Sequence, residues 1–230
     1  MKKDFISVIL LAGGLGTRMK SALPKHLLPL NQKPIVLYSF EVFRRLPEIS
    51  EIVVVCDSAS YSFFPQEKNV KFASPGQRRQ DSVYNGLMQV DPRAELICIH
   101  DAARPLLSAD VVRRCLQAGI AHGAATVGMP VKFTVKESRE GNFVKNTLDR
   151  SALWEIQTPQ VIKKELLEKG FSIADERNLT VNDDVSLVEH LGHPVKIVEG
   201  SYANLKITTQ EDLPIAERLL VEHLHGKFTL

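Results

Sequence analysis

The chain has 230 residues, of which 44% are hydrophobic and 24% charged, a globular composition that provides a core large enough for one α/β domain. Its 29 basic and 27 acidic residues give a formal net charge of +2, too small for a surface that binds nucleic acid or an anionic membrane. No apolar stretch approaches the roughly 20 residues that span a bilayer, and Cys56, Cys98 and Cys115 form no CxxC pair. We therefore expect a cytoplasmic protein with reduced, buried cysteines, although a plastid protein cleaved from its transit peptide would have the same features.

The first part of the chain alternates between strand-like and helix-like segments. Apolar runs rich in β-branched residues predict strands buried on both faces of a mostly parallel sheet, at residues 6–11, 52–56, 96–99 and 124–131. Helical periodicity predicts helices at residues 35–46, 80–90 and 109–122, with Ser108 as the N-cap of the last. This order predicts an α/β fold with a Rossmann-like, doubly wound sheet, in which ligands bind beyond the carboxyl ends of the strands.

Residues 132–148 interrupt this alternation. Two extended segments flank residues 138–142, whose Ser, Gly and Asn are typical of a turn, so we expect a β-hairpin. Because a hairpin that protrudes from a sheet has exposed edges, we expect a second subunit to cover them in a homodimer. The whole chain, residues 1–230, is interpreted as a single domain with 132–148 as its protruding β-arm.

Regular elements resume after the arm. The patterns predict helices at residues 163–174 and 183–191 and a short strand at 195–198. Thr209 is expected to open the final helix, with Asp212 as the acidic member of a capping box.

A glycine-rich segment follows the first predicted strand. Residues 11–19 read LAGGLGTRM, and glycines at such a turn let backbone N–H groups surround phosphate oxygens without a Cβ in the way. The segment lacks the end of a Walker loop, and Met19 stands where a dinucleotide fingerprint needs Gly or Ala. A plain tight turn is the alternative interpretation. Arg18 and Lys25 favour the phosphate site, because two cations beside it can neutralise charge that grows on a pentacoordinate phosphorus.

Five further segments carry a more specific signal: PGQRRQDSV at 75–83, DAARP at 101–105, TLDR at 147–150, QTPQ at 157–160 and NLKIT at 204–208. With the glycine loop and Lys25, they resemble the 2-C-methyl-D-erythritol 4-phosphate cytidylyltransferase family of pyrophosphorylase-type nucleotidyltransferases over essentially the whole chain. The resemblance implies transfer of CMP from CTP to that polyol phosphate in non-mevalonate isoprenoid biosynthesis. It also implies Mg²⁺ as the cofactor, and 4-diphosphocytidyl-2-C-methyl-D-erythritol and pyrophosphate as the products.

The resemblance further implies a role for each matching residue. Those that wrap the CTP phosphates, line the cytosine and ribose pocket or lie near the nucleotide are Ala12, Gly13, Gly14, Gly16, Thr17, Gly76, Arg79, Ser82, Asp101 and Ala102. Arg18 and Lys25 stabilise the transition state, and Asp101 lies near the Mg²⁺ ion. A carboxylate at a strand's carboxyl end also suits a hard cation. The alternative roles for Asp101 are a helix N-cap and a partner for Arg104.

Four residues match acceptor positions of the family. Thr134, Arg150 and Lys206 hold the phosphate of the acceptor, and Thr158 lies near the substrate. In the family, Thr134 and Arg150 come from the arm of the neighbouring subunit, which fits the hairpin predicted at 132–148. Arg150 and Lys206 are therefore catalytic candidates, because they would clamp the attacking phosphate.

One departure from the family pattern and three alternatives stay open. Asn182 stands where the family usually has Thr, in Asn182-Asp183-Asp184, although Asn also caps helices and forms hydrogen bonds. A cytidylyltransferase for another polyol phosphate, such as ribitol 5-phosphate, would share the CTP site and differ only in acceptor contacts. A guanylyltransferase would differ in its base pocket. A non-catalytic nucleotide-binding module would not need both Arg18 and Lys25, so their presence favours an enzyme.

Overall fold

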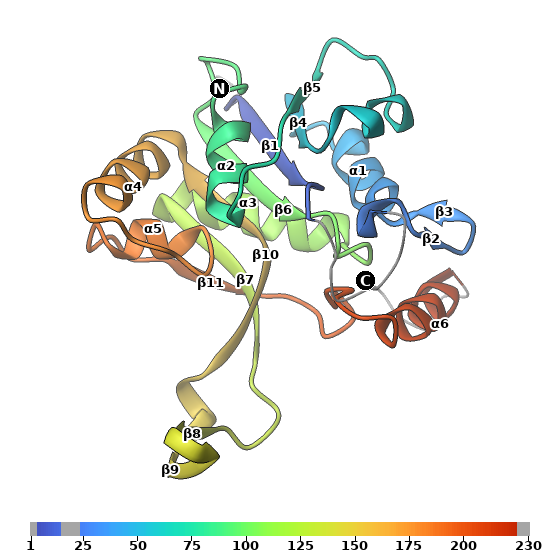
Figure 1. Cartoon of the computed structure of the whole chain (residues 1–230). Coiled ribbons are helices and arrows are strands. Elements are labelled where there is room, and N and C mark those ends of the chain that lie inside the picture. The colour runs from blue at the N-terminus through green and yellow to red at the C-terminus, as the bar shows by residue number, and fades with distance from the viewer. Residues whose placement is uncertain (1–3, 15–23, 225–230) are drawn as a thin grey trace.

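The computed structural model describes residues 4–14 and 24–224 of the chain. Its centre is a seven-stranded sheet in the order β11-β7-β10-β6-β1-β4-β5. The strands are β1 (Ile6–Leu11), β4 (Glu51–Val55), β5 (Val70–Ala73), β6 (Leu96–Asp101), β7 (Ala124–Pro130), β10 (Trp154–Lys163) and β11 (Lys196–Glu199). β10 runs antiparallel to β6 and β7, and the other neighbouring pairs are parallel, which confirms the predicted mostly parallel sheet (Figure 1).

Helices cover both faces of the sheet (Figure 1). One face carries α1 (Ile35–Arg45) and α3 (Ala109–His122), and the other carries α2 (Arg79–Leu87), α4 (Lys164–Glu176) and α5 (Val185–Glu189). In β1, Leu10 packs in the cluster that contains Phe40 of α1, whereas Ile9 packs in the cluster that contains Val83 of α2. Since successive side chains of a strand point to opposite faces, a strand that is apolar at every position is covered on both. The predicted doubly wound α/β arrangement is thereby confirmed.

Capping residues in the sequence predicted the start of one helix correctly and the start of another three residues too early. The Oγ atom of Ser108 accepts a hydrogen bond from the N–H of Val111 at 3.2 Å, which confirms the predicted N-cap of α3. The last helix, α6 (Asp212–Leu224), begins at Asp212 rather than at Thr209. The Asp212 carboxylate nevertheless accepts from the N–H groups of Thr208 and Thr209 at 2.7 and 2.9 Å, so the predicted capping contact forms ahead of the helix.

Two strands of the sheet, β5 and β10, and a small antiparallel ladder of β2 (Pro29–Leu30) and β3 (Lys33–Pro34) were not predicted. The sequence pattern did not predict β10, because its apolar run is interrupted by Gln157, Thr158, Pro159 and Gln160. Its register against β7 shifts between Gln157 and Gln160, as at a β-bulge. Pairing with β6 and β7, rather than local pattern, makes this segment a strand.

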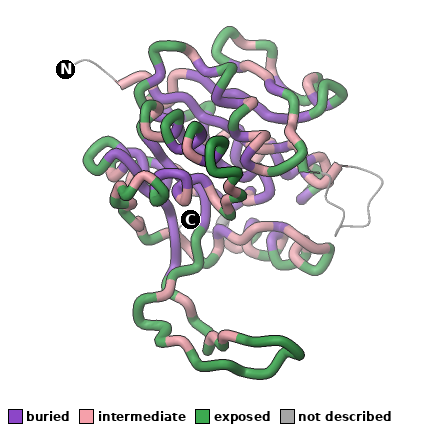
Figure 2. Tube along the Cα trace, turned by 60° about the vertical axis from the view of Figure 1, so that its left-hand side comes forward, coloured by how far each residue is buried: buried purple, intermediate pink, exposed green. Residues whose placement is uncertain are grey.

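The segment predicted to be a hairpin forms one. β8 (Lys136–Arg139) pairs antiparallel with β9 (Phe143–Thr147) around Gly141 and Asn142, which adopt φ values of 74° and 59°. The hairpin projects away from the sheet (Figure 1), and its residues are mostly exposed (Figure 2). Phe133 and Phe143 have exposed fractions of 80% and 66%, which leaves large apolar side chains in solvent. Exposed apolar side chains of this size are typical of a surface that contacts a partner.

A third apolar cluster joins α6 to the carboxyl end of the sheet. Its buried members are Leu30, Ile35, Leu106, Ile207, Ala216 and Leu220. Because Ile207 is part of this cluster, the segment that carries Lys206 is anchored beside the end of β6. The three cysteines are buried and free, as predicted. Among the described helices, none combines the length and the apolar character that crossing a bilayer requires.

Candidate active site

A cleft of about 460 Å³ lies where β1 and β6 end and the glycine turn begins. Parallel strands that share a sheet end at the same edge, and this edge is where doubly wound folds bind ligands. The predicted residues that meet in its lining are Ala12, Gly13, Gly14, Lys25, Gly76, Arg79, Ser82, Asp101, Ala102 and Lys206. They come from five separate segments of the chain. Gly16, Thr17 and Arg18 lie outside the described residues.

Two glycines of the lining permit close backbone approach. A Cβ at Gly13 would lie 2.3 Å from the Cβ of Pro75, so a larger residue would push the two loops apart. A Cβ at Gly76 would lie 2.4 Å from the Cβ of Asp81. The Gly76 N–H donates to Ser82 Oγ at 2.9 Å, which joins this loop to the first turn of α2. The glycine turn and the loop before α2 therefore form adjoining walls of the cleft.

Opposite charges meet at the floor of the cleft. Asp101 Oδ1 accepts from Arg79 Nε and Nη2 at 3.1 and 3.0 Å, and Asp101 Oδ2 accepts from Lys206 Nζ at 2.6 Å. Burial alone would raise the pKa of Asp101, but the Arg79 and Lys206 cations outweigh it and hold the pKa well below its usual range. Asp101 is therefore an anion. Asp101 is not a helix N-cap, because it ends a strand. Arg104 is a lesser partner: its cation adds to the lowering of the Asp101 pKa, while its guanidinium donates to the Asn204 carbonyl at 2.8 Å.

The guanidinium of Arg79 also contacts Asp184, the residue that precedes α5. Nη1 and Nη2 donate to the two carboxylate oxygens of Asp184 at 2.7 and 2.8 Å. Burial raises the pKa of Asp184 above its usual range, and Arg79 opposes the rise. The two carboxyl groups differ because Asp101 has two cationic partners, whereas Asp184 has one and lies near the negative charges of Asp101 and Asp183.

A hydrogen-bond chain fixes the backbone at Asp101 from behind. His100 Nε2 lies 3.2 Å from the Arg104 carbonyl oxygen, which can only accept, so Nε2 carries the ring proton. Nδ1 then accepts from Thr158 Oγ1 at 3.0 Å, and Thr158 Oγ1 accepts from the Asp101 N–H at 3.1 Å. Complete burial lowers the pKa of His100 to about 4, which keeps the ring neutral.

Hydrogen bonds join the segment that carries Lys206 to the residues after β6 and to β10. The Ile207 N–H donates to the Ala103 carbonyl at 2.8 Å, and Asn204 Nδ2 donates to the Thr158 carbonyl at 2.9 Å. Asn204 is 1% exposed, so these bonds lie out of reach of water. Lys206 is thus held at the end of β6 by the side-chain amide of Asn204 on one side and by the backbone N–H of Ile207 on the other.

Comparison with known proteins identifies the family to which the chain belongs. The family model of 2-C-methyl-D-erythritol 4-phosphate cytidylyltransferase, IspD, matches residues 6–222.
The chain belongs to the 2-C-methyl-D-erythritol 4-phosphate cytidylyltransferase family.
The resemblance stated from the sequence is thereby confirmed.

Relatives in this family come from bacteria and from a plant. The chain is 51% identical to the protein named 2-C-methyl-D-erythritol 4-phosphate cytidylyltransferase, chloroplastic, of Oryza sativa subsp. japonica, over 96% of this chain and 76% of that protein. It is 42% identical to the cytidylyltransferase of Caldanaerobacter subterraneus subsp. tengcongensis, over 94% and 98% of the two chains. The crystal structure of 4-diphosphocytidyl-2C-methyl-D-erythritol synthase from Anaerococcus prevotii matches with a TM-score of 0.84 at 28% identity, over 96% of this chain and 100% of that one.

Three predicted acceptor residues of this family member do not line the cleft of their own chain. Thr134 lies on the exposed arm and Arg150 lies exposed at its base, where Arg150 Nη1 donates to the Lys132 carbonyl. Thr158 is 5% exposed and lies behind Asp101, with its hydroxyl engaged by Asp101 and His100. The arrangement assigns Thr158 a supporting position and leaves the arm residues facing solvent.

The sequence analysis did not single out Asp184, the member of Asn182-Asp183-Asp184 that contacts Arg79. Asn182 is exposed, whereas Asp183 Oδ1 accepts from the Ser186 N–H at 3.1 Å at the start of α5. Asp184 is buried against Arg79. The signal that could have pointed to Asp184 is the pair of adjacent carboxylates ahead of a helix, because one of them can cap the helix while the other pairs with a cation.

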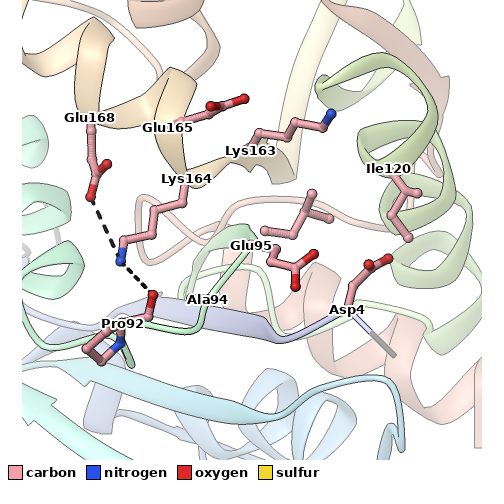
Figure 3. Close-up of a pocket in the computed structure, with 10 residues that line it drawn as sticks. Asp4, Pro92, Ala94, Glu95, Ile120, Lys163, Lys164, Glu165 and Glu168 are labelled. Carbon is pink, nitrogen blue, oxygen red and sulfur yellow. Dashed lines mark hydrogen bonds and ion pairs between the residues drawn. The ribbon is translucent and has the colours of Figure 1, made fainter. Parts of the chain in front are cut away.

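A second cavity, of about 570 Å³, lies at the opposite edge of the sheet, beside the amino end of β6 (Figure 3). Lys163, Lys164, Glu95 and Glu168 are among the residues that line it. Lys164 Nζ lies 3.9 Å from Glu168, an exposed pairing of little energetic weight. The cavity contains none of the predicted nucleotide or acceptor residues, so the cleft at the carboxyl edge is the candidate active site.

The buried, neutral His100 predicts how stability depends on pH. Its pKa is about 4 in the folded chain and about 6.5 when unfolded, so the unfolded state binds more protons between these values and stability falls as pH drops through this window. His100 accounts for about 2 kcal/mol of the loss between pH 7 and pH 5. The free energy of unfolding, measured with urea at both pH values, should fall by about 2 kcal/mol less in His100→Gln than in the wild type. The exposed His190→Gln is the matched control and should keep the wild-type difference; equal pH differences in all three proteins would contradict the assignment.

Proposed function

We propose that the chain transfers CMP from CTP to 2-C-methyl-D-erythritol 4-phosphate, forming 4-diphosphocytidyl-2-C-methyl-D-erythritol and pyrophosphate in non-mevalonate isoprenoid biosynthesis. One observation carries the proposal. In a member of this family, the glycine turn, Lys25, Asp101 and Lys206 converge on one cleft at the carboxyl edge of the sheet. These are the groups that a triphosphate and an acceptor phosphate require side by side.

The chemistry needs little from a protein base. The phosphate monoester of the acceptor has a second pKa near 6 and is an anion at neutral pH. One of its oxygens forms a bond to the α-phosphorus of CTP, while the bond from that phosphorus to the bridging oxygen of the β-phosphate breaks. The electron pair leaves with pyrophosphate. The enzyme then contributes in-line positioning and stabilisation of the transferred charge.

The residues of the site divide this work between the two reactants. Lys25 lies beside the glycine turn and neutralises charge at the α-phosphorus and on the departing pyrophosphate, together with Arg18. Gly76, Arg79 and Ser82 form the wall that receives the ribose and cytosine. Lys206 clamps the acceptor phosphate. Its side chain is 38% exposed and its ammonium has three donors, so it can bond the phosphate while keeping Asp101.

Mg²⁺ is proposed as a cofactor that arrives with CTP. Within residues 4–14 and 24–224, no group of three or more His, Cys, Asp or Glu side chains could hold a metal unaided. Mg²⁺ commonly binds one or two carboxylates together with substrate phosphates, and the anionic Asp101 at the cleft floor fits this mode. When bound, the ion would neutralise triphosphate charge.

The exposed arm is proposed to complete the site of a second subunit. Thr134 and Arg150 are exposed and do not line the cleft of their own chain, and the arm presents Phe133 and Phe143 to solvent. A C₂ homodimer would cover these apolar side chains and give each cleft one borrowed Arg150 and one borrowed Thr134. The acceptor phosphate would then lie between Arg150 of one protomer and Lys206 of the other.

A release assay tests the function directly. The purified chain is incubated with each nucleoside triphosphate and a panel of polyol phosphates that includes ribitol 5-phosphate, and pyrophosphate is measured. We expect release with CTP and 2-C-methyl-D-erythritol 4-phosphate, and its loss when EDTA removes Mg²⁺. Asp101→Asn should raise the Mg²⁺ requirement or abolish activity. Preference for ribitol 5-phosphate or GTP would replace the proposed substrates, and full activity in EDTA would refute the metal.

The charge pair beside the glycine turn should act mainly in the transition state. Lys25→Ala or Arg18→Ala should lower kcat by about 10²–10³-fold, the scale of a lost transition-state donor. The dissociation constant of CTP, measured by calorimetry, should change much less. Near-normal kcat in either variant would remove that residue from catalysis, and an equal loss in binding and kcat would make it a ground-state contact.

Mixing two inactive variants tests the shared site. Arg150→Ala and Lys25→Ala chains are each expected to be nearly inactive alone. In a mixed dimer one site has both defects and the other has none, so random pairing should restore about a quarter of wild-type activity. Mixing Lys206→Ala with Lys25→Ala is the control, since both residues line one chain's cleft and every mixed site keeps a defect. No recovery in the first mixture, despite subunit exchange shown by mass spectrometry, would place Arg150 in its own chain's site.

A further inference from the structure

Arg79 is shared between two carboxylates that belong to different parts of the fold. Two of its nitrogens bond Asp184 at 2.7 and 2.8 Å, and Nε and Nη2 bond Asp101 at 3.1 and 3.0 Å. A guanidinium presents its five N–H groups in one rigid plane. The bidentate bond to Asp184 therefore determines the direction of the N–H groups that remain for Asp101.

Asp184 lies outside the cleft that it influences. Its side chain is 2% exposed, and it is absent from the described lining, to which Arg79, Asp101 and Lys206 contribute. A ligand in the cleft can thus contact Arg79 but not Asp184. Any effect of Asp184 on the reaction has to pass through the Arg79 guanidinium.

Two glutamines hold the segment on which Asp184 stands. Gln80, the residue after Arg79, donates from Nε2 to the Leu179 carbonyl at 3.1 Å and accepts from the Val181 N–H at 3.0 Å. From β10, Gln160 Oε1 accepts from the Asp184 N–H at 2.8 Å. Both glutamines are buried, so these bonds are shielded from water. The fold fixes Asp184 from both sides without using its carboxylate, which leaves that carboxylate for Arg79.

We infer that Asp184 is a positioning residue, which orients Arg79 so that Arg79 and Lys206 hold the Asp101 carboxylate in one orientation at the cleft floor. This inference rests on the proposed function, because it assigns Asp101 and Arg79 to nucleotide binding. Asp184 also supplies the second negative charge of the cluster. Within this cluster the charges of Asp101 and Asp184 balance those of Arg79 and Lys206.

The competing explanation is structural. An ion pair from α2 to the segment before α5 would stabilise the fold and leave the cleft unchanged. The neighbouring Asp183 separates the two explanations. Asp183 Oδ1 accepts from the Ser186 N–H at 3.1 Å and Asp183 Oδ2 accepts from Gln160 Nε2 at 3.0 Å, and its described bonds do not include Arg79.

The test compares Asp184→Asn with the matched control Asp183→Asn, which removes the same charge one residue earlier. Each variant is examined by thermal unfolding, CTP calorimetry with Mg²⁺ and steady-state kinetics on folded protein. Asp184→Asn should lower kcat/KM for CTP by about 10–100-fold, the effect of a small misplacement in a site. It should weaken CTP binding about tenfold. Asp183→Asn should lower the unfolding midpoint and keep kcat/KM within about threefold.

A double-variant cycle shows whether the effect passes through Arg79. Arg79→Lys keeps a positive charge for Asp184 but loses the planar fork, and should itself lower kcat/KM for CTP at least about tenfold. Adding Asp184→Asn to Arg79→Lys should then change kcat/KM by less than about threefold. The double variant leaves no buried carboxylate that has lost its cation, so this comparison remains available if Asp184→Asn alone does not fold.

Three results would overturn the inference. They are wild-type kcat/KM and CTP affinity in folded Asp184→Asn, an equal kinetic loss in Asp183→Asn, and losses that multiply in the double variant. The CTP affinities separate this failure from failure of the proposed function. If the wild type binds CTP but turns over no 2-C-methyl-D-erythritol 4-phosphate, the acceptor assignment is wrong, and the affinities of the variants still decide the role of Asp184.

Discussion

The Asp101 carboxylate draws together side chains that lie far apart in the chain. Arg79 reaches it from the first turn of α2 and Lys206 from the segment before α6, and both meet it at the end of β6. An anion between two cations keeps its charge despite being buried, because the Coulomb attraction exceeds the desolvation penalty. The cleft depends on this contact, since it fixes the position of three of its charged groups relative to the sheet.

The residues around Asp101 hold the charged side chains in one arrangement. β10 runs antiparallel between β6 and β7, which places its polar residues 157–160 at the same edge as Asp101. Thr158 and His100 then hold the Asp101 backbone, and Asn204 and Ile207 hold the segment of Lys206. Buried polar groups in such a network are bonded to one another, so the network favours a single geometry.

The arm is proposed to provide what the cleft of a single chain lacks on the acceptor side. The sheet and its helices form the CTP cleft within one chain, but the described cleft has cations mainly on the nucleotide side. A hairpin with exposed aromatic side chains and a basic residue at its base provides both an association surface and a further cation. The proposed dimer thus links assembly to the acceptor half of the site, because the same segment that buries apolar surface delivers Arg150.

The amino-acid sequence alone determined the elements that depend on local pattern. Continuous β-branched runs specify strands such as β1, the Ser108 cap specifies the start of α3, and turn residues specify the arm hairpin. Motif order also identified the family, and most of the described residues it indicated meet in one cleft. The tertiary structure alone decided which groups pair. It made 154–163 a strand despite its polar centre, placed Thr158 behind Asp101, and turned Asp184 rather than Asn182 toward Arg79. Those outcomes rest on contacts between segments up to 105 residues apart, and local periodicity contains no information about such contacts.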